Sequence, residues 1–322
     1  MLVGIVGAGV AGLACAHGLT GRGHDVVLFD KGRGPGGRMS TRRLQTAQGE
    51  AHFDHGAQYF TVREDDFGAQ VNAWIADGVV APWPAAGAGA YVGVPAMNSP
   101  VRQLAGRHDV HWSSRVTAVR RGGAGWRLTL DGGEVHDVGV LVIAIPAEQA
   151  AELLADAAPD LAVQAGAAIS EPCWTVMAAF AQPVMIAVDC WRGADERPQD
   201  ILGWAARNSA KPARTGPQSW VVQGTPAWSQ RCIDSDPDEV VTTLLAALSN
   251  EFGVHLPPPI ATAAHLWRFA RSAYGGPGPV YDPDRRLGLC GDWLIGPRVE
   301  SAWVSGARLA ERIGAAAGGT EL

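Results

Sequence analysis

Apolar residues at the start of the chain form two short runs, separated by a glycine-rich turn and a helical stretch. Leu2–Val6 and Val26–Phe29 have the length of buried strands, and mostly small residues run from Gly12 to Leu19. This order predicts strand, tight turn, helix and strand. Such a βαβ unit places its two strands parallel in one sheet.

Further strands and a few helices are predicted along the rest of the chain. Strands are expected at 115–120, 126–130, 138–145, 174–180, 201–206, 220–223, 262–269 and 287–290. Helices are expected at 63–77, 237–252 and 299–313, and loops rich in Pro and Gly at 81–90 and 275–279. The helix at 237–252 has the clearest ends, because Asp236 suits an N-cap, Pro237 the first turn and Gly253 the C-terminal cap.

Length and charge exclude several classes of protein. The 322 residues correspond to about two domains. The net charge of −6 argues against a basic nucleic-acid surface. No apolar run reaches the ~18–20 residues of a membrane helix. The apolar start lacks a preceding Lys or Arg, which argues against a signal peptide.

The cysteines indicate neither a disulfide scaffold nor a metal site. They are odd in number, contain no CxxC pair and are scattered: Cys15, Cys173, Cys190, Cys232 and Cys290. This usage is typical of a reducing compartment, so we expect a cytoplasmic protein without a bound metal.

The first turn carries the strongest motif in the chain. In Gly7-x-Gly9-x-Ala11-Gly12, the first glycine allows the tight turn, the second lets backbone amides approach a pyrophosphate, and the third lets the helix pack on the strand. Asp30 ends the second strand, where a carboxylate can accept hydrogen bonds from ribose hydroxyls. The motif therefore predicts a dinucleotide site.

A second glycine segment follows directly. Between Lys31 and Arg38 it repeats the glycine spacing and ends in Gly37, but no helical period follows. We therefore expect not a second βαβ unit but a segment that brings amides and one guanidinium against phosphate.

The C-terminal segment predicts a second contact with the cofactor. Asp292 follows a strand and can accept hydrogen bonds from a sugar-alcohol chain, and a helix opens at Val299 and Glu300. The positive end of that helix can stabilise the negative charge of a reduced flavin. Nicotinamide alone would not need this contact, so the cofactor is expected to be FAD. No cysteine is placed for a covalent link, so we expect it to be bound non-covalently.

Together these motifs resemble the FAD-dependent amine oxidase superfamily and, within it, the bacterial renalases. The narrower resemblance rests on residues 36–41, 53–61, 95–99, 206–212 and 291–306. It implies that Val116 contacts the adenine and that residues 141–146 form a strand beside the flavin. It also implies that the cofactor site includes His55, Gly56, Ala57 and Gln58.

The resemblance implies an oxidase of isomeric dihydronicotinamide dinucleotides. Hydride transfer to flavin N5 gives NAD(P)⁺, and O2 then gives hydrogen peroxide. No general base is needed, because the product is an aromatic cation. An amine oxidase would place an aromatic residue before the last helix, where this chain has residues 296–298, Gly-Pro-Arg. Amine oxidation and a non-catalytic flavin-binding role remain the alternatives. For an NAD(P)H-dependent hydroxylase, the only suitable pair, Asp131-Gly132, is better explained as a hairpin turn.

Several residues could contact the substrate, which we expect to be a small dinucleotide acting with O2. The candidates are Tyr59, Lys211, His265, Arg268 and Arg298. Lys211 could instead be a solvated loop lysine, and Tyr59 a structural aromatic residue. Strand alternation places His265 and Arg268 on opposite faces, so one of them can be structural. Neither a nucleic-acid nor a membrane partner is expected. The oligomeric state, the isomer and the choice between NAD and NADP stay open.

The predicted fold class is α/β. A glutathione-reductase-like FAD-binding Rossmann domain is expected from residues 1–62, 96–148 and 272–322. An antiparallel-sheet α+β substrate domain is expected from residues 63–95 and 149–271.

Overall fold

The N-terminal segment forms the βαβ unit that the apolar pattern predicts. The computed structural model describes residues 1–123, 125–193, 199–272 and 275–318. Its first elements are β1 (Leu2–Val6), α1 (Val10–Thr20) and β2 (Asp25–Phe29). The two strands pair in parallel, and the Gly7 amide donates a hydrogen bond to the Phe29 carbonyl. The turn before α1 is therefore fixed directly against the end of β2.

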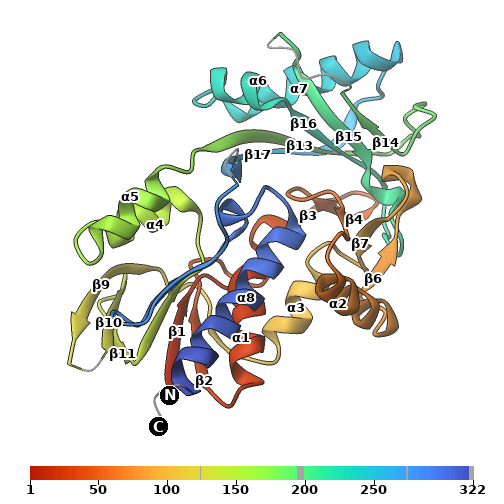
Figure 1. Cartoon of the computed structure of the whole chain (residues 1–322). Helices are drawn as coiled ribbons and strands as arrows, with labels where there is room; N and C mark the ends of the chain where they lie inside the picture. The colour runs from red at the N-terminus through yellow and green to blue at the C-terminus, as the bar shows by residue number, and fades with distance from the viewer. Residues whose placement is uncertain (124, 194–198, 273–274, 319–322) are drawn as a thin grey trace.

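A six-stranded sheet brings the two ends of the chain together (Figure 1). Its strands, in spatial order, are β18 (Val280–Asp282), β19 (Leu287–Leu289), β12 (Val140–Ile143), β1, β2 and β8 (Asp109–His111). All neighbours pair in parallel except β18 and β19. The carboxyl ends of the parallel strands therefore meet at one edge, where ligands bind in open sheets of this kind.

Both faces of this sheet are covered, as the apolar run at 138–145 predicts. Val140 and Val142 face a core shared with α1 and α8 (Val299–Gly318), while Leu141 and Ile143 face a second core. The second core lies under α4 (Ala147–Leu154), α5 (Pro159–Gly166) and the antiparallel strands β9 (Val116–Gly122), β10 (Gly125–Leu130) and β11 (Val135–Val138). The sequence did not predict α4 and α5.

A five-stranded antiparallel sheet forms the other end of the molecule (Figure 1). Its order is β14 (Cys190–Arg192), β15 (Leu202–Arg207), β16 (Gln218–Gly224), β13 (Ser170–Phe180) and β17 (Pro259–Ser272). One face packs against α7 (Pro237–Phe252), with α6 (Pro226–Arg231) beside it. The predicted ends of α7 are confirmed: the Asp236 side chain accepts from the Asp238 amide, and Gly253 is left-handed.

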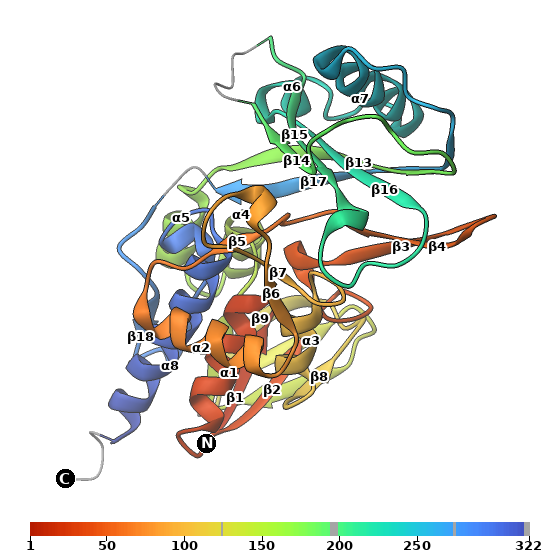
Figure 2. The ribbon, with the colours of Figure 1, turned by 90° about the vertical axis from the view of Figure 1, so that its right-hand side faces the viewer.

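A hairpin and a small sheet lie between the two large sheets (Figure 2). They consist of β3 (Thr41–Thr46) with β4 (Gly49–Asp54), and of β5 (Phe60–Thr61), β7 (Ala90–Gly93) and β6 (Val80–Pro82). Phe53 of β4 packs on Met177 and Val221 of the five-stranded sheet. Phe67 and Trp74 of α2 (Asp65–Ala76) join the core of α1 and α8. The predicted boundaries of two domains remain a prediction.

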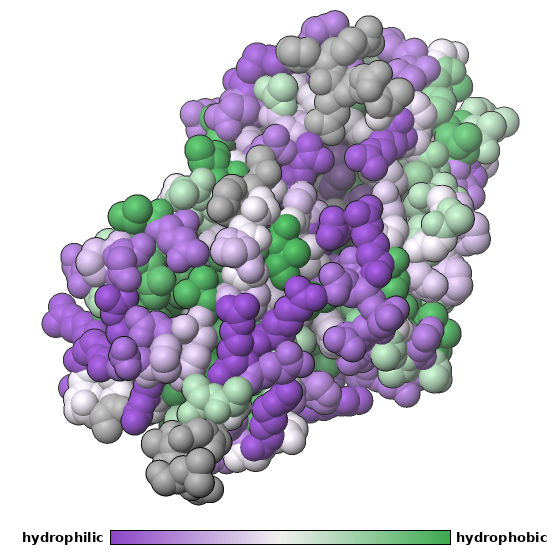
Figure 3. Space-filling model, viewed as in Figure 1, coloured by the Kyte–Doolittle hydropathy of each residue, from purple (hydrophilic) through white to green (hydrophobic). Residues whose placement is uncertain are grey.

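Polar side chains dominate the face in Figure 3, and apolar ones gather there in small groups. None of the helices in the described ranges is long and apolar enough to cross a bilayer.

Candidate active site

The turn between β1 and α1 has the geometry of a phosphate-binding loop. A Cβ on Gly7, whose φ is +103°, would lie 2.6 Å from the Ala144 carbonyl oxygen, and one on Gly12 would lie 1.9 Å from the Gly7 carbonyl oxygen. Gly9, by contrast, has nothing within 4 Å of its Cβ position. Among the described residues no side chain caps this first turn, so its amides are available to a pyrophosphate.

Helix α8 crosses α1 directly behind this loop. A Cβ on Gly306 would lie 2.0 Å from the Ala11 carbonyl oxygen, so only a glycine permits the approach. Ala11 itself is buried in the first turn of α1. Its contact with α8 links the N-terminal loop to the C-terminal part of the predicted site.

The second glycine segment lies over the first. Gly37 has a φ of +51°, and its Cβ position is 3.8 Å from the Gly9 Cα. Only a short 3-10 turn, η1 (Gly37–Met39), follows it. At the start of the segment, the exposed Lys31 donates to Gln149 Oε1 at 3.1 Å. Gly37 therefore lies at the phosphate loop, whereas Lys31 is directed toward α4.

Asp30 is held at the end of β2 by two backbone amides. Its Oδ2 accepts from the Ala8 amide and its Oδ1 from the Gly32 amide, both at 2.7 Å. Each carboxylate oxygen keeps a further lone pair for another donor. The side chain therefore has a fixed orientation beside the phosphate loop, where the sequence predicts the ribose.

Arg38 and Asp292 bind each other. Arg38 Nη1 lies 2.9 Å from Asp292 Oδ2, and Nη2 lies 2.5 Å from Oδ1, across 254 positions of sequence. Arg38 also donates to the Ala270 carbonyl at 3.3 Å. The sequence predicts separate cofactor contacts for these residues. The ion pair instead joins η1 to η4 (Asp292–Leu294) across the site.

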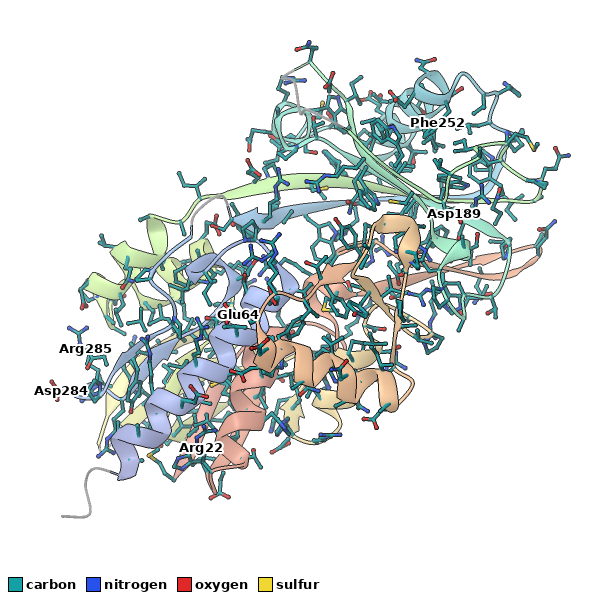
Figure 4. All side chains as sticks on the ribbon, turned by 45° about the vertical axis from the view of Figure 1, so that its right-hand side comes forward. Arg22, Glu64, Asp189, Phe252, Asp284 and Arg285 are labelled. Atoms are coloured by element: carbon teal, nitrogen blue, oxygen red, sulfur yellow. The ribbon has the colours of Figure 1, made fainter. Side chains whose placement is uncertain are left out.

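The start of α8 contains buried polar atoms without a partner among the described residues. Glu300 Oε1 accepts from the amides of Arg63, at 2.5 Å, and Glu64, at 2.9 Å. Glu300 Oε2 and Ser301 Oγ have no hydrogen bond, and Arg298 Nε lies 3.7 Å from Glu300 Oε2. Figure 4 shows Glu64 where α2 meets α8. Glu300 Oε1 thus ties the start of α8 to the residues just before α2, while Oε2 accepts no hydrogen bond from a described residue and has Arg298 at ion-pair distance.

Residues 54–58 connect the hairpin to the five-stranded sheet. The His55 carbonyl accepts from Trp267 Nε1 at 2.8 Å, and the Gly56 carbonyl accepts from Gln223 Nε2 at 3.1 Å. Gln58 Nε2 donates to the carbonyls of Asp54 and Gly56.

On its other side, this 54–58 segment is tied to η1. The Ala57 amide donates to the Arg38 carbonyl at 2.8 Å, and a Cβ on Gly56 would lie 2.0 Å from that oxygen. The segment that the sequence assigns to the cofactor site is therefore held by hydrogen bonds from the five-stranded sheet on one side and to η1 on the other.

Asp54, which the sequence did not single out, is the centre of a buried charge cluster. Its Oδ2 accepts from Lys211 Nζ at 3.2 Å and from Arg214 Nη2 at 2.6 Å, and its Oδ1 accepts from Thr41 Oγ1 at 2.7 Å. The side chains of Asp54 and Lys211 are 0% exposed, so the alternative that Lys211 is a solvated loop lysine is wrong. Burial alone would raise the pKa of Asp54, but the two cations hold it well below its usual range.

Two histidines and a tryptophan form an aromatic cluster beside the 54–58 segment. The His55 ring lies 5.1 Å from both His265 and Trp267, and the last two rings are 4.5 Å apart. Burial, together with the nearby His265 and Arg42, lowers the pKa of His55 to about 4. Arg268 points the other way, toward Asp234 at 3.7 Å, with 57% of its side chain exposed. His265 therefore lies near the site, and Arg268 does not.

Tyr59 and Val116 lie in different surroundings. Tyr59 stacks on Trp204 of β15, with centroids 5.4 Å apart and rings inclined by 26°. Val116, at the start of β9, is buried in the second core, which also contains Phe29 of β2. Tyr59 thus reaches the five-stranded sheet, while Val116 lies at the cofactor end near Asp30. The described ranges contain no group of three or more potential metal ligands.

The comparisons with known proteins agree with this fold. Residues 5–77 match an NAD(P)-binding Rossmann-like domain. Residues 83–314 match the flavin-containing amine oxidoreductases. The chain belongs to this family, and its cofactor is FAD.

Solved structures share the fold over nearly the whole chain. A protein of Exiguobacterium sp. 255-15, assigned as a protoporphyrinogen oxidase, has a TM-score of 0.75 at 13% identity and covers 98% of both chains. Cyclohexylamine oxidase of Brevibacterium oxydans has a TM-score of 0.71 at 15% identity, over 97% of this chain and 98% of its own. A putrescine oxidase bound to putrescine has a TM-score of 0.64 at 14% identity, over 98% and 99%.

A curated relative matches only locally. The 4,4'-diapophytoene desaturase of Staphylococcus haemolyticus is 52% identical over 40 residues, which are 12% of this chain and 8% of the desaturase. The chain therefore spans a small part of that relative's length.

The residues present fit FAD. The open space in front of Gly9 can take the pyrophosphate, and Asp30 lies where the ribose would follow. At the other end, Glu300 Oε2 and Ser301 Oγ, which have no hydrogen-bond partner among the described residues, lie at the start of α8 and can bind polar groups of the cofactor. The phosphate loop and the start of α8 thus both offer groups that suit FAD, and the residue-by-residue assignment stays a prediction.

Proposed function

We propose that this flavoprotein oxidises isomeric dihydronicotinamide dinucleotides to NAD(P)⁺ and, with O2, forms hydrogen peroxide. The observation that carries this proposal is the charge of the site. Asp54 is shared between Lys211 and Arg214, and Asp292 is paired with Arg38. An anionic dinucleotide suits such surroundings better than a protonated amine does.

The start of α8 supports the same substrate. Arg298, with 38% of its side chain exposed, has Glu300 as its ion-pair partner at 3.7 Å, a distance longer than a hydrogen bond. An aromatic amine cage would need a ring at this place, and the chain has Gly296, Pro297 and Arg298 there. We assign Arg298 to a substrate phosphate.

In this reaction the main task of the protein is to position the substrate against the cofactor. FAD, when bound, supplies the acceptor for a hydride and passes the two electrons to O2. One dihydronicotinamide, one proton and one O2 give one NAD(P)⁺ and one hydrogen peroxide. The product ring is aromatic, so no side chain has to remove a proton. His265 and Tyr59 are assigned to the walls that hold the nicotinamide ring.

Anaerobic stopped-flow spectroscopy tests this function. Flavin bleaching is followed with each dihydronicotinamide isomer, ordinary NAD(P)H and simple amines. We expect fast bleaching by an isomer whose extra hydride is not at the fourth ring carbon. Bleaching by amines alone would identify an amine oxidase. No bleaching by any donor would identify a non-catalytic flavin-binding protein.

A matched pair of variants tests the assignment of Arg298. Arg298→Gln should raise KM for dinucleotide isomers by about 10- to 150-fold, because a charge-assisted hydrogen bond is worth about 1.5–3 kcal/mol. Arg268→Gln is the control, because Arg268 lies on the exposed face of β17, opposite His265, and this variant should leave KM unchanged. Equal effects of both variants would remove Arg298 from the substrate site.

A further inference from the structure

One carboxylate is shared by two cations inside the protein. The side chains of Asp54, Lys211 and Arg214 are 0%, 0% and 1% exposed. Thr41 Oγ1 and the Met97 amide, at 2.7 and 3.0 Å from Asp54 Oδ1, add donors but no charge. With both cations protonated, this cluster carries one net positive charge shielded from water.

The two cations have different partners on their outer sides. Arg214 Nη1 donates to the carbonyls of Gly93 and Pro212, at 2.9 and 3.0 Å, so its guanidinium is fixed to backbone. Lys211 Nζ lies 3.3 Å from Gln58 Oε1 and 5.2 Å from the centre of the Trp83 ring. Of the two cations, it is Lys211 that contacts Gln58, a residue that the sequence assigns to the cofactor site.

The contact between Lys211 and Gln58 fixes the amide of that glutamine. Because Oε1 accepts from the ammonium, Nε2 must donate, and it does so to the carbonyls of Asp54 and Gly56. Lys211 is thus linked, through the Gln58 side chain, to the backbone carbonyls of the 54–58 segment.

We propose that Asp54 is a positioning residue that holds the Lys211 ammonium against Gln58 and so keeps a buried positive charge behind the FAD-binding segment. A reduced flavin carries more negative charge than an oxidised one, so this charge favours reduction. The inference concerns FAD and this chain's own residues, and it holds whichever substrate is oxidised.

The same contacts determine the pKa of Lys211. Burial lowers the pKa of Lys211 to about 8; Asp54 and, to a smaller extent, Cys190 of β14 oppose the decrease, and Arg214 adds to it. Removing Asp54 should therefore lower this pKa further, and removing Arg214 should raise it. A decrease of the Lys211 pKa in one variant and an increase in the other distinguish an electrostatic role of Asp54 from a merely structural one.

The chain permits a direct measurement, because Lys31 and Lys211 are its only lysines. In the FAD-loaded protein with isotope-labelled lysine, NMR should give two side-chain signals, and Lys31→Arg identifies the signal of Lys211. We expect its midpoint near pH 8, about 1–3 pH units lower in Asp54→Asn, and higher in Arg214→Gln. A midpoint that does not move in folded Asp54→Asn, or that moves in the same direction in both variants, overturns the proposal. If Asp54→Asn does not fold, an unchanged or lowered midpoint in Arg214→Gln overturns it.

The flavin potential gives a second readout that does not depend on substrate. Lys211→Met should make the midpoint potential more negative at pH 7 and remove an additional decrease that the unmodified protein shows above pH 8. The control Asp137→Asn breaks an exposed pair with Arg127 and should change neither. An unchanged potential in Lys211→Met would show that the buried charge does not act on FAD, and would overturn the proposal.

Discussion

At the phosphate loop, the partners lie close in sequence, whereas around Asp54 they come from distant segments. Asp30 accepts from Ala8 across 22 positions. Asp54 accepts from Lys211 across 157 positions. The loop depends on the space that glycines leave, and the cluster depends on attraction between opposite charges that are shielded from water. Steric defects should therefore damage the cofactor end most, and charge or protonation changes should act most at the Asp54 end.

The largest effect is expected from a methyl group in the loop. In Gly12→Ala the new Cβ would lie 1.9 Å from the Gly7 carbonyl oxygen, so backbone must move, at a cost of about 3 kcal/mol or more. Gly9→Ala is the matched control, because its Cβ position is open within 4 Å. Urea unfolding without FAD should separate the two, with Gly9→Ala nearly as stable as the unmodified chain but weaker in FAD binding. Equal stability of both variants would contradict a steric role for Gly12.

Low pH should destabilise the Asp54 end of the molecule through protonation of His55. The unfolded chain protonates this histidine near pH 6.5, while burial holds its pKa at about 4 in the folded chain. Between these values the unfolded state binds more protons than the folded state. The contribution of His55 to the free energy of unfolding is therefore fully present above pH 6.5 and is lost as the pH decreases, by up to about 3 kcal/mol. Unfolding without FAD from pH 7 to 4 should show this loss, and His55→Gln should reduce it. His255→Gln, on the exposed loop after α7, should not.

The same contrast explains what the sequence could predict. The βαβ unit and α7 follow from local spacing and capping residues, and both are present as expected. Helices α4 and α5 are only eight residues long and have no side-chain cap, so the proline and the acidic residue near the start of each did not suffice to predict them. Lys211 lies in a Pro-flanked loop that resembles a solvated one, and only tertiary packing buries it against Asp54. The pairing of Arg38 with Asp292 likewise needs the two ends of the chain to meet.

A smaller effect is expected at Asp30, on the cofactor side. Asp30→Ala should weaken FAD binding roughly 10- to 150-fold, because a hydrogen bond to a charged group contributes about 1.5–3 kcal/mol. Asp137→Ala removes an exposed carboxylate elsewhere and is the control. Titration of the FAD-free chain followed by flavin fluorescence measures both. An undiminished affinity in Asp30→Ala would remove this residue from the ribose site.

The smallest effect should come from the hydrogen bond that ties the 54–58 segment to β17. Trp267→Phe keeps an aromatic ring beside His55 and His265 but removes the Nε1 donor that lies 2.8 Å from the His55 carbonyl oxygen. The loss of one neutral hydrogen bond should lower the free energy of unfolding by about 1 kcal/mol. Because the 54–58 segment is held at Gly56 and Ala57 as well, FAD affinity should change less than in Asp30→Ala. Urea unfolding and FAD titration of this variant, beside Arg268→Gln from the exposed face of the same strand, measure both quantities. A loss of FAD affinity larger than that of Asp30→Ala would mean that Trp267 supports the cofactor more directly than its bond to one carbonyl implies.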